Sequence, residues 1–185
     1  VVITTFDLVE NRTRFIKPWK EEYKDWSLIT AIRGSCTVPT FFPVPEGRYV
    51  DGGVGSFANP CYVAAYEAIK CLGWLPEETT VISLGTGRDP YSFDAKKASQ
   101  MFAWNWLMPM FGAFLHSAED QQVHLVDTFF ADIDFRRFQV DLSKPMDMDD
   151  PSNIPVLMDY GKKLGEMILN DETDRAMHVA AKRAA

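Results

Sequence analysis

The sequence is poor in the residues that build disulfide frameworks and metal sites. Only three of its 185 residues are cysteines and three are histidines. Cys36, Cys61 and Cys71 form no CxxC pair, and an odd number at such spacing argues against a set of disulfides. The histidines, at positions 116, 124 and 178, lack the spacing of zinc ligands. We therefore predict a cytoplasmic protein, from a reducing compartment, with no bound metal.

Basic runs and long apolar runs are also missing. The formal net charge is −7, and without a cluster of Lys and Arg nothing would hold a phosphate backbone, so nucleic acid is not an expected partner. The most apolar stretch, MFAWNWLMPMFGAFL at 101–115, is too short to span a bilayer and is interrupted by Pro109. The first residues, VVITTFDL, have no basic region before an apolar stretch, so they do not form a signal peptide. They indicate instead a strand within a domain, which predicts that the chain is part of a longer protein.

The overall composition is that of one globular domain. The apolar fraction of 46% and the charged fraction of 24% are ordinary for this class. We predict a single domain over residues 1–170 and a frayed tail over 171–185. The turn Gly85-Thr86-Gly87 lacks the further glycine or the lysine of a nucleotide-binding loop, so no cofactor is predicted.

The spacing of apolar residues predicts alternating strands and helices. Strands are expected at Val1–Thr5, Thr13–Lys17, Tyr49–Val50, Val81–Leu84 and Phe135–Leu142. Helices are expected before Gly34, from Asn59-Pro60 to Gly73, and from Ser152-Asn153 to Leu169. A strand, a helix and a strand in succession predict a parallel pair. We therefore expect an α/β fold whose mostly parallel sheet, built from Val1–Thr5, Tyr49–Val50 and Val81–Leu84, is flanked by helices.

One carboxylate follows a strand at a sharp corner. In RYVDGGVGSFANP, Asp51 precedes Gly52 and Gly53, which permit unusual backbone angles and leave room beside the carboxylate. Catalytic groups of open α/β sheets lie at such carboxyl ends. Asp-Gly is also a frequent turn dipeptide, in which the carboxylate only caps its own turn. A catalytic Asp51 would keep one oxygen free and face a cleft.

Four segments, in order, resemble the patatin-like phospholipase family. They are AIRGSCTVPTFFPV, YVDGGV, ANP and VISLGTG, and the resemblance covers about residues 1–90. It implies that Asp51 is the aspartate of a Ser–Asp dyad, that Gly52 and Gly53 form its supporting turn, and that the intact protein is a hydrolase that degrades phospholipids or other acyl lipids.

The nucleophile of that family lies in a GxSxG elbow, which this chain lacks. The serines of RGSCT, VGSFA and VISLG, at positions 35, 56 and 83, are not framed by glycines in that way. We therefore expect the chain to be the C-terminal part of a catalytic domain, inactive alone. Such a part would leave a sheet edge or face open, to be covered by the N-terminal part or a second copy.

An aromatic and methionine-rich group leaves a second interpretation open. Its members suit an acyl-chain pocket or a transient membrane contact, but also a core helix or a dimer interface, which are commoner. They are Trp104, Trp106, Met108, Met110, Phe111 and Phe114. The alternative function is accordingly a binding module on a degenerate hydrolase scaffold, with this group as its surface and DGG as a plain turn.

Overall fold

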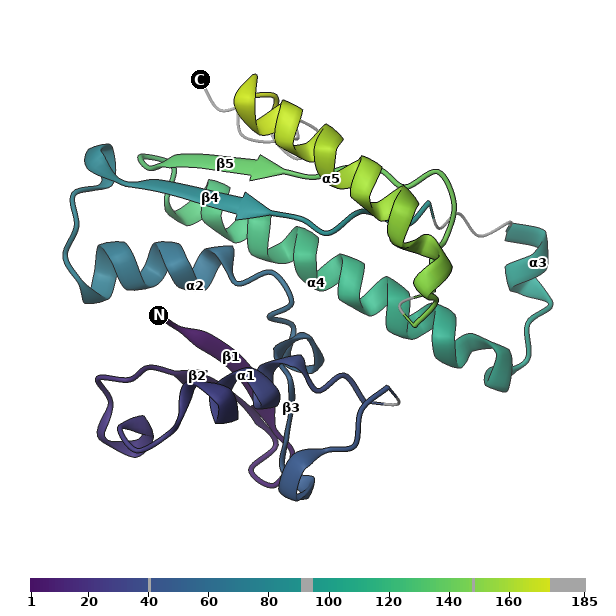
Figure 1. The fold of residues 1–185 in the computed structure, drawn as a ribbon, viewed down its shortest axis with the longest axis horizontal. Coiled ribbons are helices and arrows are strands. Elements are labelled where there is room, and N and C mark those ends of the chain that lie inside the picture. Colours follow the sequence, from purple (N-terminus) through teal and green to yellow (C-terminus); the bar gives the residue numbers. More distant parts are fainter. Residues whose placement is uncertain (40, 91–94, 148, 174–185) are drawn as a thin grey trace.

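The computed structural model describes residues 1–39, 41–90, 95–147 and 149–173 of a mixed α/β protein (Figure 1). Its strands are β1 (Ile3–Asp7), β2 (Arg12–Ile16), β3 (Tyr49–Asp51), β4 (Thr80–Leu84) and β5 (Asp134–Phe138). Its helices are α1 (Leu28–Cys36), α2 (Cys61–Tyr66), α3 (Ala95–Ser99), α4 (Leu107–Phe129) and α5 (Ile154–Leu169). From residue 174 on, the predicted tail lies outside the described residues.

The first part of the chain forms an antiparallel sheet in the order β2-β1-β3. The first two strands expected from the sequence are present as β1 and β2, and they pair with each other. Helix α1 lies on this sheet, and the Thr5 hydroxyl joins the two by donating to the backbone oxygens of Gly34 at 3.0 Å and Val50 at 2.8 Å. Thr5 and Val50 have no exposed surface, so β1 and β3 are fixed where β3 leads into the Asp51 corner.

The second part forms a parallel pair, β4-β5, connected through α3 and α4. One face of the pair packs on α2 and α4. The core there consists of Cys61, Ala65, Val81, Val123, Val126, Phe130 and Ile133. Pro109 does not interrupt α4, because it lies in the first helical turn, where the missing N–H has no helical partner to lose.

The predicted mostly parallel sheet is wrong. β3 pairs with β1 in the antiparallel direction, and β4 belongs to the other sheet. A parallel connection does occur, but it joins β4 to β5 across α4 rather than β3 to β4 across α2. The prediction failed because an apolar run has the same local pattern in either strand direction, so direction follows from how the intervening helix packs.

The helix predicted after Asn59-Pro60 is present, and its start is capped as expected. The Cys61 backbone N–H donates to Asn59 Oδ1 at 3.3 Å. The helix continues beyond α2 as a π-helical turn to Cys71, and Gly73 follows with a φ of 71°. In α5 the apolar side chains are only partly covered, since none of them is fully buried. No helix in the described ranges is long and apolar enough to cross a bilayer.

Candidate functional site

Asp51 ends β3 and begins a short 3-10 turn, Gly52–Gly55. Its half-buried carboxylate accepts one hydrogen bond, from the Gly53 backbone N–H to Oδ1 at 2.7 Å. Oδ2 accepts none from the described residues. Burial raises the pKa of the Asp51 carboxyl above its usual value, and the Gly53 hydrogen bond opposes that shift. One oxygen is therefore used within the turn, as a structural role predicts, while the other stays available, as a catalytic role requires.

Gly52 and Gly53 are needed for space rather than for unusual backbone angles. Neither has a positive φ. A Cβ on Gly52 would lie 2.4 Å from Thr4 Oγ1, and a Cβ on Gly53 would lie 2.9 Å from Asp51 Oδ1. The second position would also meet Ala58 Cβ at 3.3 Å. The pair of glycines therefore lets the turn pack against β1 and keeps the carboxylate uncovered.

No serine or histidine of the described residues hydrogen-bonds to Asp51. The Ser83 hydroxyl is buried and bonded elsewhere, and Ser56 ends the turn with a φ of 71°. His124 lies on α4, where its ring Nε2 is 3.5 Å from Thr128 Oγ1. No group of acidic, His or Cys side chains in the described ranges could hold a metal ion. The sequence-predicted aspartate thus lies at a strand end, and within the described ranges no serine or histidine is bonded to it.

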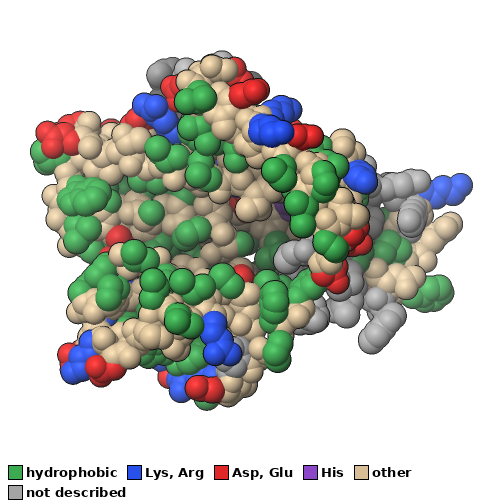
Figure 2. All heavy atoms as spheres, viewed as in Figure 1, with side chains coloured by type: hydrophobic (Ala, Val, Ile, Leu, Met, Phe, Trp, Pro, Cys, Tyr) green, Lys and Arg blue, Asp and Glu red, His purple; other side chains and the backbone are tan. Residues whose placement is uncertain are grey.

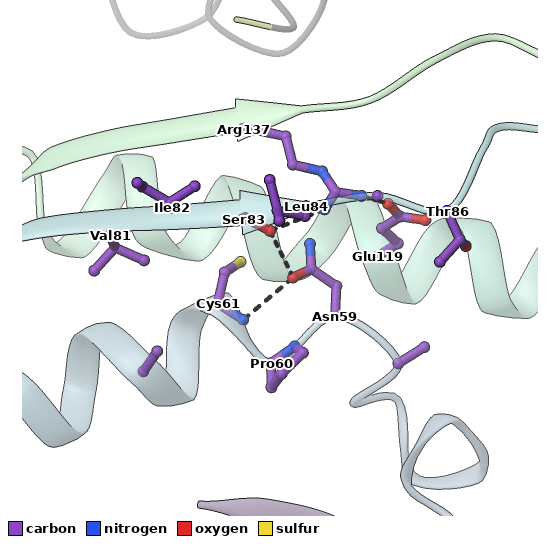
Figure 3. A pocket seen from close by; sticks show the side chains of 13 residues that line it. Asn59, Pro60, Cys61, Val81, Ile82, Ser83, Leu84, Thr86, Glu119 and Arg137 are labelled. Atoms are coloured by element: carbon purple, nitrogen blue, oxygen red, sulfur yellow. Dashed lines mark hydrogen bonds and ion pairs between the residues drawn. The ribbon is translucent and has the colours of Figure 1, made fainter. Parts of the chain in front are cut away.

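A second polar site lies between the start of α2 and β4, beside a pocket of about 390 Å³ (Figure 3). Ser83 donates to Asn59 Oδ1 at 3.0 Å and accepts from Arg137 Nη1 at 2.9 Å. Arg137 also forms an ion pair with Glu119 of α4. Arg137 is only 4% exposed, so its charge depends on these partners. The network ties α2, β4, β5 and α4 together at one end of the parallel pair.

The sequence did not predict this network. Asn59 was expected only to cap a helix, but its Oδ1 accepts hydrogen bonds from both the Cys61 backbone N–H and the Ser83 hydroxyl. The two arginines of DFRRF could have indicated a buried arginine on this strand. Consecutive residues of a strand point to opposite faces, so one of the two must face inward. Arg136 is the outward one and pairs with Asp134 at 2.7 Å.

The aromatic and methionine-rich group lies at the start of α4 and just before it. Met110 is 62% exposed and Phe114 is 47% exposed, so these two side chains do not belong to the core. The Trp106 indole N–H donates to the Met101 backbone oxygen at 3.3 Å. The side chains of Trp104, Met108 and Phe111 lie outside the described structure. The exposed side chains of Met110 and Phe114 are compatible with a contact surface.

No protein-family model matches this chain, and no curated protein matches it either. The patatin-like resemblance accordingly rests on the four ordered motifs.

Proposed function

We propose that this chain is the C-terminal part of a lipid acyl hydrolase, in which Asp51 is the base for a serine supplied by the N-terminal part of the domain. The observation that supports this most is the Asp51 carboxylate at the end of β3. One of its oxygens is held by the Gly53 N–H and the other has no hydrogen-bond partner among the described residues. The patatin-like motif order supports the same assignment.

In the proposed reaction, Asp51 takes the proton of the serine hydroxyl while the serine oxygen attacks the ester carbonyl of a phospholipid or other acyl lipid. The proton then passes to the departing alcohol, and the acyl group stays on the serine. Water then attacks this acyl-enzyme while Asp51 takes a proton from it, and the proton passes to the serine oxygen as the fatty acid is released. Burial raises the pKa of Asp51, which brings a carboxylate base closer to neutral pH and makes it a stronger proton acceptor.

The second candidate function is a binding module without catalysis. It is favoured by the hydrogen bond of Asp51, which lies within its own turn, and by exposed apolar side chains such as Met110. In that case the exposed start of α4 would be the binding surface and Asp51 would only shape the turn.

The two functions are separated by Asp51→Asn in the protein encoded by the complete reading frame. Asn keeps an oxygen for the Gly53 N–H but cannot accept the serine proton. We expect hydrolysis of a fluorogenic acyl ester to fall by roughly 10²–10⁴-fold in kcat/KM, with a nearly unchanged thermal midpoint. Asp132→Asn, at an exposed position, is the matched control and should keep full activity.

Two results would count against the enzyme proposal. Normal ester hydrolysis by the Asp51→Asn protein would make Asp51 a turn residue only. A complete reading frame without a GxSxG elbow would favour the binding module.

A further inference from the structure

Helix α4 contacts the turn that follows Asp51. A Cβ on Gly53 would lie 3.5 Å from Leu115 Cδ2, so the Leu115 side chain packs on this turn. Further along the same face of α4, Gln122 Nε2 donates to the Ser56 backbone oxygen at 3.2 Å. Helix α4 therefore holds the turn through an apolar contact and a hydrogen bond.

Gln122 is a polar residue at a core position of α4. It is only 4% exposed, and buried apolar residues surround it in the helix sequence, namely Ala118, Val123 and Val126. Its Oε1 is buried and accepts no hydrogen bond from the described residues. An apolar side chain of this length would avoid the cost of burying such an oxygen. What a glutamine adds here is the donor that it supplies to Ser56.

The oxygen that Gln122 contacts begins a series of hydrogen-bonded peptide groups. The C=O of Ser56 and the N–H of Phe57 belong to one peptide group. This group accepts from Gln122 and donates, through the Phe57 N–H, to the Gly52 oxygen at 3.0 Å. The side-chain amide on α4 is thereby connected to the start of the turn.

The series ends at Asp51. The Gly52 oxygen and the Gly53 N–H again belong to one peptide group, and this N–H donates to Asp51 Oδ1 at 2.7 Å. A peptide group whose oxygen accepts a hydrogen bond becomes a stronger donor, by about 10–30% for each bond. The hydrogen bond from Gln122 therefore strengthens the one that the carboxylate accepts.

The Gln122–Ser56 hydrogen bond also joins the two halves of the molecule. Figure 2 shows hydrophobic side chains gathered along the hollow between the half that contains β1 and the half that contains β4. Apolar contacts are non-directional, whereas a hydrogen bond requires one geometry. This hydrogen bond therefore fixes the orientation of the Asp51 turn relative to α4.

We propose that Gln122 is a positioning residue for Asp51. Through the series of hydrogen bonds it holds Oδ1 on the Gly53 N–H, so that Oδ2 stays free for the serine that Asp51 would serve. This inference rests on the proposed function and adds to it a residue on α4, far from Asp51 in the sequence.

An NMR titration of the unmodified chain tests the series without a substitution. When Asp51 takes up a proton, its hydrogen bond from Gly53 weakens, and the change passes back along the series. The Phe57 amide proton and the side-chain NH₂ of Gln122 should therefore shift with the same midpoint as the Asp51 carboxyl. The exposed side chain of Gln121 is the internal control and should not share this midpoint. In Asp51→Asn the shared shifts should disappear.

A substitution at position 122 tests the positioning role. Gln122→Met removes the donor at nearly constant length, and Gln121→Met, at the adjacent exposed position, is the matched control. In this chain, Gln122→Met should raise the pKa of Asp51 by about 0.3, since a weaker donor stabilises the carboxylate less. Burial and the Gly53 hydrogen bond are the causes of the Asp51 pKa shift, and no charged side chain of the described residues is among them.

The same pair of variants is then compared in the protein encoded by the complete reading frame. Gln122→Met should lower kcat for a fluorogenic acyl ester by roughly tenfold with a nearly unchanged KM, because the substrate still binds while the base is less well placed. The acid limb of its pH profile should move upward with the pKa of Asp51. Gln121→Met should change neither.

Two results would overturn the proposal. One is a Phe57 amide and a Gln122 side chain that do not titrate with Asp51 in the unmodified chain. The other is an unchanged Asp51 pKa and kcat in Gln122→Met, shown to be folded by its thermal midpoint, which would make the glutamine only a link between the two halves. Normal hydrolysis by Asp51→Asn would instead refute the proposed function, and with it the catalytic purpose of Gln122, while a shared titration would still establish the series.

Discussion

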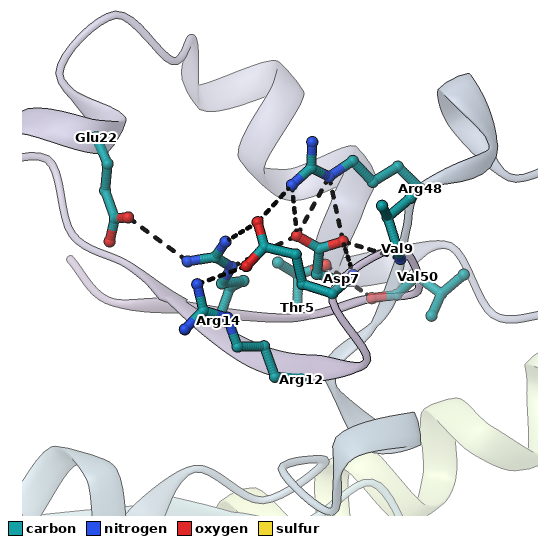
Figure 4. Close-up of polar contacts among 9 residues, drawn as sticks. Thr5, Asp7, Val9, Arg12, Arg14, Glu22, Arg48 and Val50 are labelled. Carbon is teal, nitrogen blue, oxygen red and sulfur yellow. Dashed lines mark hydrogen bonds and ion pairs between the residues drawn. The ribbon is translucent and has the colours of Figure 1, made fainter.

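Asp7 is a buried carboxylate whose removal should lower stability by a predictable amount. It ends β1, has no exposed surface and accepts from Arg48 Nη2 at 2.8 Å and Arg48 Nε at 3.1 Å (Figure 4). The backbone N–H groups of Val9 and Glu10 also donate to it, at 3.1 and 3.2 Å. The Arg48 hydrogen bonds are the largest cause that lowers the pKa of Asp7 from 3.8 to about 2, against the effect of burial.

The size of this shift sets the expected loss. A change in pKa from 3.8 to about 2 corresponds to roughly 2–3 kcal/mol, at about 1.4 kcal/mol for each pKa unit. Solvent screening reduces this figure, because the Arg48 side chain is 35% exposed. Asp7→Asn keeps an oxygen for both backbone N–H groups, which donate to the same Oδ1, but loses the charge. We therefore expect it to lower the free energy of unfolding at neutral pH by about 1–2 kcal/mol.

The same shift gives the pH dependence. Because the folded-state pKa of Asp7 lies below the unfolded value, its contribution is complete above the unfolded pKa and is lost as the pH falls through the folded one. The difference between the unmodified chain and Asp7→Asn should therefore be constant above about pH 5 and shrink as the pH falls from 3.8 toward about 2.

Urea unfolding followed by tryptophan fluorescence measures this difference. Trp26 lies in the same part of the molecule, with its ring 5.0 Å from that of Tyr49, so its emission reports the unfolding of that part. Asp159→Asn removes an exposed carboxylate and should change stability by less than about 0.5 kcal/mol. Equal stability of Asp7→Asn and the unmodified chain at pH 7, or a difference that persists unchanged at pH 2.5, would refute the reasoning.

Two further predictions concern packing. Gly52→Ala should lower the free energy of unfolding by about 1–3 kcal/mol, because the added Cβ would lie 2.4 Å from Thr4 Oγ1 and 3.0 Å from the Thr4 backbone oxygen. Gly161→Ala on α5, where nothing lies within 4 Å, should instead raise it by about 0.5–1 kcal/mol in the same urea titration. Burial raises the pKa of the Cys61 thiol to about 11, so a chromogenic disulfide reagent at pH 8 should modify the other two cysteines in the folded chain and Cys61 only in denaturant. Rapid modification of all three thiols in the folded chain would contradict this.

Local chemistry in the sequence was sufficient for several elements. Alternating or β-branched apolar runs predicted β1 and β4 within a few residues, and Asn59-Pro60 predicted the start of α2. The corner at Asp51 was likewise predicted from the strand before it and the two glycines after it. These features depend on residues that are close in sequence, whose backbone preferences act wherever the segment lies in the fold.

Which elements pack against one another was decided only by the tertiary structure. Strand direction, the separation of β4 from the first sheet, and the burial of Arg137 against Glu119 all depend on contacts between residues far apart in the chain. The same holds for the Asp51 corner: the sequence identified the carboxylate, but only the packing of Gly52 on β1 determined why glycine is required beside it. Periodicity determines which face of a segment is apolar, whereas the partner of that face is selected by packing over the whole chain.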